Sequence, residues 1–245
     1  MKYFKPIACL ILCASLTLPY YDAREYTSFK PGGQYIILTF EDGPHPEYTP
    51  KLLDILKEKK IKATFFVTGA NARNHPTILA RMEKEGHDIA NHGWDHSDLT
   101  KLSSTELKGQ LIKTNRAITD STTIIPQVIR APYGTINKEV SDFIANHLRL
   151  HVVNWSIDVN NYLKMKPVLI GNKIAKDATP GDVLLMNDNT SWTLAVITHI
   201  LDQLTDKNFE FLTIADVLLF PDDTPRGVGK EKPTFTYSKR KLRHK

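Results

Sequence analysis

The chain has 245 residues, of which 41% are hydrophobic and 24% charged, a composition that suits one globular domain and excludes a disordered or fibrous protein. Its formal net charge is +5. Lys2, Lys5 and the five basic residues among the last seven positions carry seven of the positive charges, so that the remainder of the chain has a formal charge of −2. This distribution argues against a nucleic-acid-binding groove in the body of the chain.

The first predicted element is an export signal. Lys2 and Lys5 precede an apolar run over residues 7–18, which is the pattern of a secretory signal peptide, here placed at residues 1–20. The run is shorter than the ~20 residues that cross a bilayer. A retained signal anchor stays open because no clean cleavage site lies within residues 15–23, and a buried core helix is a third alternative. We predict secretion.

Both cysteines, Cys9 and Cys13, lie inside the predicted signal. Cleavage would leave a chain without thiols, because no other cysteine occurs. Disulfides are then excluded, and any metal site must use histidine and carboxylate ligands.

From residue 35 onward, β-rich segments alternate with helical patterns. The strands are predicted at 35–40, 63–67, 128–131, 150–157, 183–186 and 209–212. The helices are predicted at 50–59, 77–85, 103–118, 138–146, 167–176, 193–205 and 215–219. Ser103 and Glu106 form a capping box at the start of one helix, and Gly86 ends another.

The repeated order of strand and helix predicts parallel strands joined by crossover helices, in a closed barrel or an open doubly wound sheet. About seven or eight such units favour a single-domain α/β fold, a distorted (β/α)7–8 barrel over residues 21–225. Periodicity is lost beyond Pro221, so residues 226–245 are predicted to form a basic, disordered tail. In such a barrel the chemistry should lie at the carboxyl ends of the strands.

Acidic and histidine side chains follow the predicted strands. The strand 35–40 runs into Glu41 and Asp42, two carboxylates beside a Gly-Pro turn, a pattern that by itself is also typical of a solvated turn. His92 and His96 are three residues apart, a spacing that lets both imidazoles reach one ion. Together with Asp42 they would form a set of two histidines and one carboxylate that leaves positions open for water and substrate, as in catalytic metal sites.

Five segments carry a resemblance to a known family. In chain order they are TFEDGP (39–44), HGWDH (92–96), RAPYG (130–134), WSIDVNNY (155–162) and GDVLLMND (181–188). They resemble the ordered motifs of the NodB-type polysaccharide deacetylases, and the likeness extends over residues 35–219. The resemblance implies a distorted β/α barrel and metal-dependent removal of N- or O-acetyl groups from chitin, chitooligosaccharides, peptidoglycan or xylan.

The resemblance also implies roles for individual residues. The implied metal ligands, usually for zinc, are Asp42, His92 and His96. Glu41 takes the place of the general base, where the family normally has Asp, and Arg130 would hold this base. The backbone N–H of Tyr133 would stabilise the tetrahedral oxyanion. Tyr133, Tyr162 and Leu185 are expected to contact the substrate.

The departures from the family pattern concern the proton donor. Asn187 stands where the family normally has a His that protonates the leaving amine, and Asn161 stands where an Asp normally orients that His. An amide cannot deliver a proton near neutral pH, and loss of general-acid catalysis typically costs about 10²- to 10⁴-fold in rate. Two alternatives stay open: a shifted alignment with Asp188 or His151 as the donor, and Glu41 acting as both base and acid.

We therefore predict a secreted carbohydrate deacetylase that uses Zn²⁺ or another divalent transition metal, with an altered acid pair and reduced activity. Its partner would be an acetylated polysaccharide or oligosaccharide, with no nucleic acid and no stable membrane span. The alternative is an inactive polysaccharide-binding or matrix protein that keeps the fold, and a hydrolase of small non-sugar amides also stays open. The basic run 239–245 either tethers the protein to an acidic polymer or surface, or is a solvated end.

Overall fold

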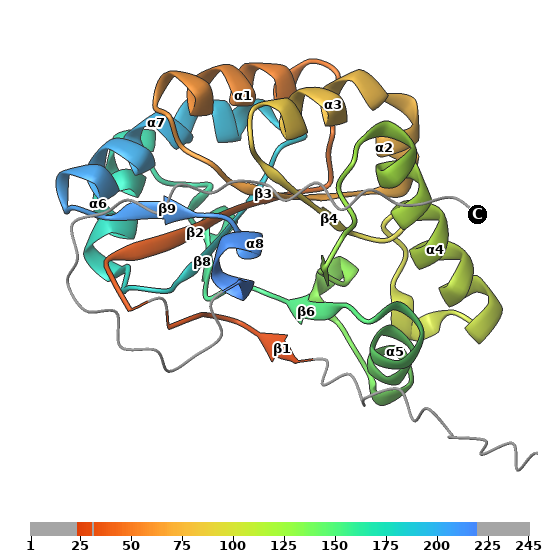
Figure 1. Cartoon of the computed structure of the whole chain (residues 1–245). Coiled ribbons are helices and arrows are strands. Elements are labelled where there is room, and N and C mark those ends of the chain that lie inside the picture. The colour runs from red at the N-terminus through yellow and green to blue at the C-terminus, as the bar shows by residue number, and fades with distance from the viewer. Residues whose placement is uncertain (1–23, 31, 220–245) are drawn as a thin grey trace, which may run out of the picture.

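The computed structural model describes residues 24–30 and 32–219. The predicted signal (1–20) and tail (226–245) lie outside these residues. The ladders between named strands are parallel, in the order β1-β6-β5-β4-β3-β2-β8-β7, with β9 paired to the start of β2 (Figure 1). Within the described part of the chain, no helix combines the length and the apolar character needed to cross a membrane.

The strands are β1 (Glu25–Tyr26), β2 (Tyr35–Glu41), β3 (Thr64–Val67), β4 (Asp88–Asn91), β5 (Val128–Ile129), β6 (His151–Val153), β7 (Ile157–Asp158), β8 (Val183–Asn187) and β9 (Glu210–Leu212). The α-helices are α1 (Tyr48–Glu58), α2 (Gly69–Asn74), α3 (Pro76–Lys84), α4 (Ser104–Ser121), α5 (Lys138–Phe143), α6 (Pro167–Asp177), α7 (Ser191–Asp206) and α8 (Ile214–Leu218). Short turns of other helix types are η1 (Leu99–Lys101), η2 (Pro132–Gly134), η3 (Ile144–Leu148) and η4 (Val159–Tyr162).

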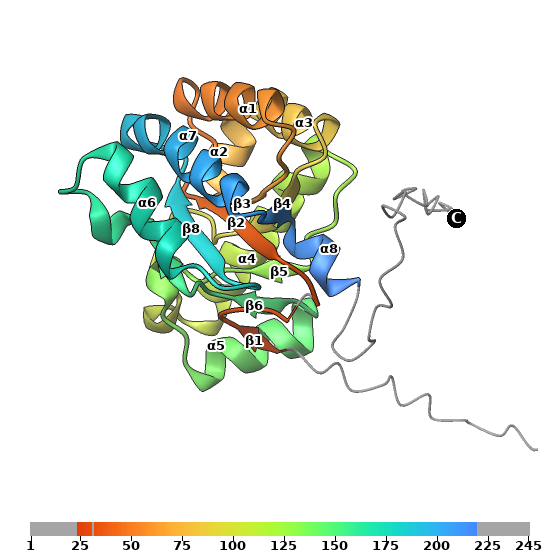
Figure 2. The same cartoon turned by 90° about the vertical axis from the view of Figure 1, so that its left-hand side faces the viewer.

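The prediction of a distorted barrel of parallel strands with helices around it is confirmed. Figure 2 shows the strands in the centre, with α1 and α3 above them, α6 to the left and α5 below. Among the described residues no ladder joins β7 to β1, the two ends of the strand order. The barrel therefore stays open between these two strands.

Two local predictions differ from the structure. The single strand predicted at 150–157 is in fact two, β6 and β7, which pair with different neighbours. The chain leaves β6 at Asn154, whose carbonyl accepts a hydrogen bond of 2.9 Å from the Arg130 guanidinium. The sequence patterns also missed β1, β4 and α2, which are too short to show a period. The predicted capping box of Ser103 and Glu106 is present at the start of α4.

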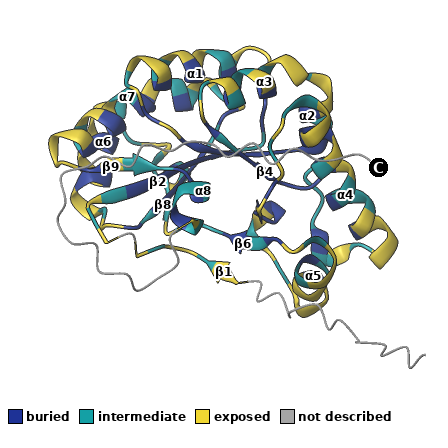
Figure 3. Ribbon diagram, in the orientation of Figure 1, coloured by how far each residue is buried: buried dark blue, intermediate teal, exposed yellow. Residues whose placement is uncertain are grey.

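Apolar side chains fill the barrel and the layer outside it. One cluster combines residues of six strands with two from α8: Ile37, Phe66, Ala90, Val128, Val153, Val183, Ile214 and Val217. The backbone N–H groups of Ile214 and Ala215 donate to side chains of Thr64 and Asp88, the first residues of β3 and β4. Helix α8 thus covers the amino ends of these strands, while the outer helices turn their exposed faces to solvent (Figure 3). The carboxyl ends of the strands are left for the site.

Candidate metal centre and catalytic pocket

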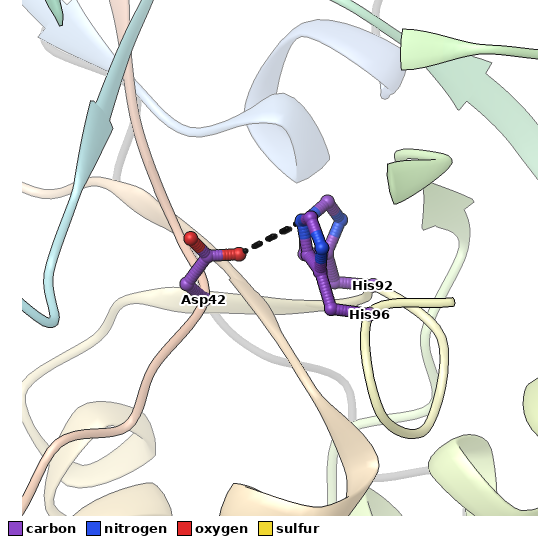
Figure 4. A group of neighbouring side chains, drawn as sticks. All are labelled: Asp42, His92 and His96. Carbon is purple, nitrogen blue, oxygen red and sulfur yellow. Dashed lines mark ion pairs between the residues drawn. The ribbon is translucent and has the colours of Figure 1, made fainter. Parts of the chain in front are cut away.

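Three predicted ligands come together at the carboxyl ends of β2 and β4. Asp42 directly follows β2, His92 directly follows β4, and His96 comes from the loop beyond it. Their candidate ligand atoms lie within 4.8 Å of one another. Asp42 Oδ1 is 3.4 Å from His92 Nε2 and 3.2 Å from His96 Nε2. One carboxylate oxygen therefore faces two imidazole nitrogens (Figure 4).

The tautomer of His92 decides what this cluster can bind. His92 Nδ1 lies 2.9 Å from the carbonyl oxygen of Arg130. Because a carbonyl only accepts, Nδ1 carries the proton and Nε2 of the neutral ring presents a lone pair. His92 Nε2 and Asp42 Oδ1 are both buried without a hydrogen-bond partner among the described residues.

When the His92 ring is neutral, its Nε2 and Asp42 Oδ1 are two buried acceptors that cannot hydrogen-bond each other, and leaving both unpaired is costly. A cation between His92 and Asp42 would satisfy both. A metal-ligating histidine characteristically donates its other ring N–H to a carbonyl or carboxylate, as His92 does to Arg130. The residues present therefore fit a divalent metal ion, and the combination of imidazole and carboxylate suits zinc and related transition metals.

Asp42 is held in a backbone conformation that few side chains adopt. Its φ is 76°, in the left-handed region that costs a non-glycine residue free energy. Asn187 Nδ2 donates to Asp42 Oδ2 at 2.6 Å, and Asn71 Nδ2 donates to the Asp42 carbonyl at 2.8 Å. Burial alone would raise the pKa of Asp42, but His92 and His96 in their protonated forms, together with the hydrogen bond from Asn187, hold that pKa below its usual value.

The loop that carries the two histidines is fixed by amides that the sequence patterns did not indicate. Asn91 is fully buried, donates to Asn115 and to the Leu111 carbonyl, and accepts from the Gly93 N–H. Gln110 of α4 accepts from the Trp94 N–H at 2.6 Å. An asparagine and a glutamine outside a recognised motif give no sequence signal, because Leu111, Asn115 and Trp94, which they bind, lie 16 to 24 positions away in the chain.

Arg130 is fully buried, with no exposed surface. Its Nη1 is 3.3 Å from Glu41 Oε2 and donates to Thr39 Oγ1 at 3.0 Å. Its Nε and Nη2 donate to the carbonyls of Val153 and Asn154. Burial lowers the pKa of Arg130 to about 10, although the Glu41 and Asp158 charges oppose that shift, so the guanidinium stays charged at neutral pH. The structure thus brings together Glu41 and Arg130, the two residues expected to form the base and its support.

Tyr133 lies beside the candidate metal ligands. Its ring meets the His96 ring edge-on at 4.6 Å between centroids, and the residue is 65% exposed. Asp42, His96 and Tyr133 all have positive φ, at 76°, 64° and 62°, and such strain gathers at functional sites. The next residue must be glycine, because a Cβ on Gly134 would lie 2.8 Å from the Trp155 ring.

The predicted acid pair lies, with Leu185 and Tyr162, on β8 and η4, two neighbouring elements. Asn187 ends β8 beside Asp42, whereas Asn161 is exposed in η4, and no hydrogen bond among the described residues joins Asn161 to Asn187. Tyr162 is half-buried against the main core cluster. Leu185 is only 3% exposed within β8.

The two alternative proton donors are both engaged elsewhere. His151 begins β6 at the amino edge of the sheet, where its Nδ1 accepts from the Arg24 N–H at 3.1 Å. Asp188 is 2% exposed and accepts from Thr49 Oγ1 at 2.7 Å and from the Gly43 N–H. Burial raises the pKa of Asp188 to about 7, against these hydrogen bonds.

The chain is similar in sequence to known deacetylases. Residues 29–153 match the family model described as polysaccharide deacetylase. A peptidoglycan-N-acetylglucosamine deacetylase, PgdA of Listeria monocytogenes, is 37% identical over 182 residues, which cover 74% of this chain and 38% of the relative. The chain thus matches well under half the length of that relative.

Solved structures show the same architecture. The Bc1960 peptidoglycan N-acetylglucosamine deacetylase superposes with a TM-score of 0.74 and 32% identity, covering 79% of this chain and 92% of that one. BA3943 of Bacillus anthracis, described as a CE4 family pseudoenzyme, superposes with a TM-score of 0.72 and 26% identity, covering 79% and 68%. The fold therefore occurs in both a named deacetylase and a named pseudoenzyme.

Proposed function

Because the chain belongs to the polysaccharide deacetylase family, we propose that it is a metal-dependent hydrolase that removes N-acetyl groups from peptidoglycan or chitooligosaccharides. One observation carries the proposal: Asp42 Oδ1 and His92 Nε2, two buried atoms with no hydrogen-bond partner among the described residues, face each other 3.4 Å apart. Zn²⁺ is the ion we expect at Asp42, His92 and His96, which matches their ligand chemistry.

The side chains divide the reaction between them. A bound divalent ion supplies polarisation of the acetyl carbonyl and activation of water. Glu41 accepts the proton of the attacking water, and Arg130, 3.3 Å from Glu41 Oε2, orients this carboxylate and balances its charge. The backbone N–H of Tyr133 donates to the oxygen on which negative charge develops. Asn187 can donate a hydrogen bond but cannot supply a proton, so Glu41 would pass the proton that it took from water on to the leaving amine.

Acetate release tests this proposal. The purified protein, loaded with Zn²⁺, should release acetate from peptidoglycan or N-acetylated chitooligosaccharides, and a chelator should abolish that release. An acetylated xylan belongs in the same panel, because a sugar hydroxyl leaves more readily than an unprotonated amine and needs the missing acid less. No release from any of the three, with or without chelator, would refute the deacetylase assignment.

A second function has an observation in its favour: both members of the usual acid pair are amides, Asn187 and Asn161. On this proposal the chain binds an acetylated polysaccharide without hydrolysing it. The double substitution Asn187→His with Asn161→Asp separates the two, measured with saturating metal. If it raises acetate release about 10²- to 10⁴-fold while oligosaccharide affinity hardly moves, the natural protein lacks general-acid catalysis.

Export and surface tethering are proposed from the sequence alone. The basic and apolar pattern of residues 1–20 supports secretion, and the basic run 239–245 supports binding to an acidic polymer. Removing residues 239–245 should weaken retention on such a polymer, most strongly at low salt. Unchanged retention would remove this run from the proposal.

A further inference from the structure

Asn187 stands where a proton donor is expected, yet its amide is already engaged. Asn187 Nδ2 donates to Asp42 Oδ2 at 2.6 Å. We propose that Asn187 is a positioning residue, which holds the Asp42 carboxylate so that its other oxygen faces the two histidines. This inference rests on the metal site of the proposed function.

The two oxygens of Asp42 have separate environments. Oδ2 accepts from Asn187, whereas Oδ1 is buried, has no hydrogen-bond partner among the described residues, and is turned to His92 Nε2 and His96 Nε2 at 3.4 and 3.2 Å. An amide N–H₂ can only donate, so Asn187 holds the Asp42 carboxylate in this one orientation. Hydrogen bonds of this kind to a ligating carboxylate fix its direction and support its affinity for the ion.

Asn187 is itself rigidly placed. In the parallel ladder between β8 and β2, Asn187 is paired with Glu41. Glu41 is the residue directly before Asp42. Its carbonyl accepts from the Thr193 hydroxyl at 2.5 Å, which ties the end of β8 to α7. The amide therefore approaches Asp42 from a strand end with little freedom to move.

Asp188, the residue that follows β8, holds the turn after Asp42 from the other side. The Asp188 carboxyl accepts from the Gly43 N–H and from Thr49 Oγ1. It lies so close that a Cβ on Gly43 would be 2.0 Å from Asp188 Oδ2. Asn187 thus fixes the Asp42 side chain and Asp188 fixes the backbone after it, which explains how Asp42 keeps its left-handed φ of 76°.

The proposal has a consequence for restoring activity. A His at position 187 would supply a proton donor but would remove the Nδ2 group that Asp42 accepts from. Asn187→His should therefore weaken metal binding even as it supplies the acid. This is why the double substitution described above is measured with saturating metal.

Metal affinity tests the proposal independently of catalysis. The full chain is compared with Asn187→Leu, which has similar shape and no donor, and with Asn189→Leu, a change at an exposed asparagine two positions on. Zn²⁺ affinity is measured by competition with a chromophoric chelator, and the visible spectrum of the Co²⁺-loaded protein reports the ligand geometry. Asn187→Leu should bind Zn²⁺ about 10- to 100-fold more weakly and shift the Co²⁺ bands. Asn189→Leu should match the wild type in both.

Circular dichroism of the metal-free proteins checks that the variants fold, and Asn187→Ala replaces Asn187→Leu if the latter does not. Equal Zn²⁺ affinity and equal Co²⁺ spectra for the wild type and the folded Asn187 variant would overturn the proposal. A wild type that binds no Zn²⁺ would overturn both this proposal and the metal site. A wild type that binds Zn²⁺ but releases no acetate would refute the deacetylase function, while weaker binding by the Asn187 variant would still support the positioning role.

Discussion

Two buried histidines lie just outside the two ends of strand β4, and they are opposite in chemistry. His87 is 2% and His92 0% exposed, and each has an Nε2 without a hydrogen-bond partner among the described residues. His87 Nδ1 accepts from the Ala63 N–H at 3.2 Å, so its Nε2 carries the proton. His92 Nδ1 donates to the Arg130 carbonyl at 2.9 Å, so its Nε2 presents a lone pair.

The comparison shows that burial and an unpaired ring nitrogen do not by themselves make a metal ligand. The main-chain group that binds Nδ1 determines the tautomer, and the group that faces Nε2 determines whether the histidine can serve as a metal ligand. His92 Nε2 meets the carboxylate of Asp42. The His87 ring instead packs edge-on against Phe65 at 5.3 Å between centroids, and burial, together with the nearby Lys62 charge, lowers the pKa of His87 to about 4. His87 is therefore a neutral core residue.

The largest expected effect comes from removing the side chain of His92, the histidine that faces Asp42. His92→Ala removes a metal ligand and should weaken Zn²⁺ binding by more than the ~100-fold upper range of an outer-shell partner. Acetate release should fall to the level of the chelated wild type. His87→Asn is the matched control, because Asn can still accept from the Ala63 N–H. Zn²⁺ competition on both proteins checks this, and equal loss of affinity in the two variants would contradict the distinction.

The ligand set could be predicted from sequence because its signal is local. His92 and His96 share one loop, and Asp42 follows the end of a strand that is strongly apolar. The tautomers could not be predicted, because they depend on the carbonyl of Arg130 and the N–H of Ala63, groups that every residue type carries. The hydrogen bond from Asn187 to Asp42 was missed for a related reason: it spans 145 positions, and the sequence showed only that a proton donor was lacking.

For the fold as for the site, features with a local signal were predictable from the sequence and features that depend on distant contacts were not. Strand β2 is a long continuous apolar run and α7 shows a helical period, and the order of such elements was enough to predict parallel strands and a barrel. Strand β4 is four residues long and buried on three of them, so it shows no alternation. The split between β6 and β7 depends on Arg130 binding the carbonyl of Asn154, a contact between distant segments.

Arg130 tests how far the surroundings of His92 depend on one side chain. Arg130→Met keeps the carbonyl that fixes the His92 tautomer but removes the guanidinium. The change removes the positive charge beside Glu41. It also removes the guanidinium donors that bind the carbonyls of Val153 and Asn154. Breaking a buried pair in this way should lower the free energy of unfolding by about 3–5 kcal/mol.

Denaturant unfolding measures this loss, and Zn²⁺ affinity is measured on the folded fraction of Arg130→Met. We expect the affinity to fall less than in His92→Ala, because all three ligands remain. If Arg130→Met were as stable as the wild type, the guanidinium would not be the support of this pocket.

The smallest expected effect is confined to the other end of β4 and depends on pH. His87 has a folded pKa of about 4, below its usual 6.5. Between these values the unfolded chain binds a proton that the folded protein does not, so the stability contributed by neutral His87 is lost as the pH falls. Over that window the loss of stability amounts to about 3 kcal/mol.

Asp88 affects the stability in the opposite direction, because burial raises its pKa to about 6. The plot of unfolding free energy against pH for the wild type therefore understates the contribution of His87. The difference between the wild type and His87→Asn isolates that contribution, because both proteins retain Asp88. Unfolding free energies measured from pH 7 to pH 4 should show His87→Asn gaining on the wild type as the pH falls; parallel curves would mean that His87 is protonated in the folded protein.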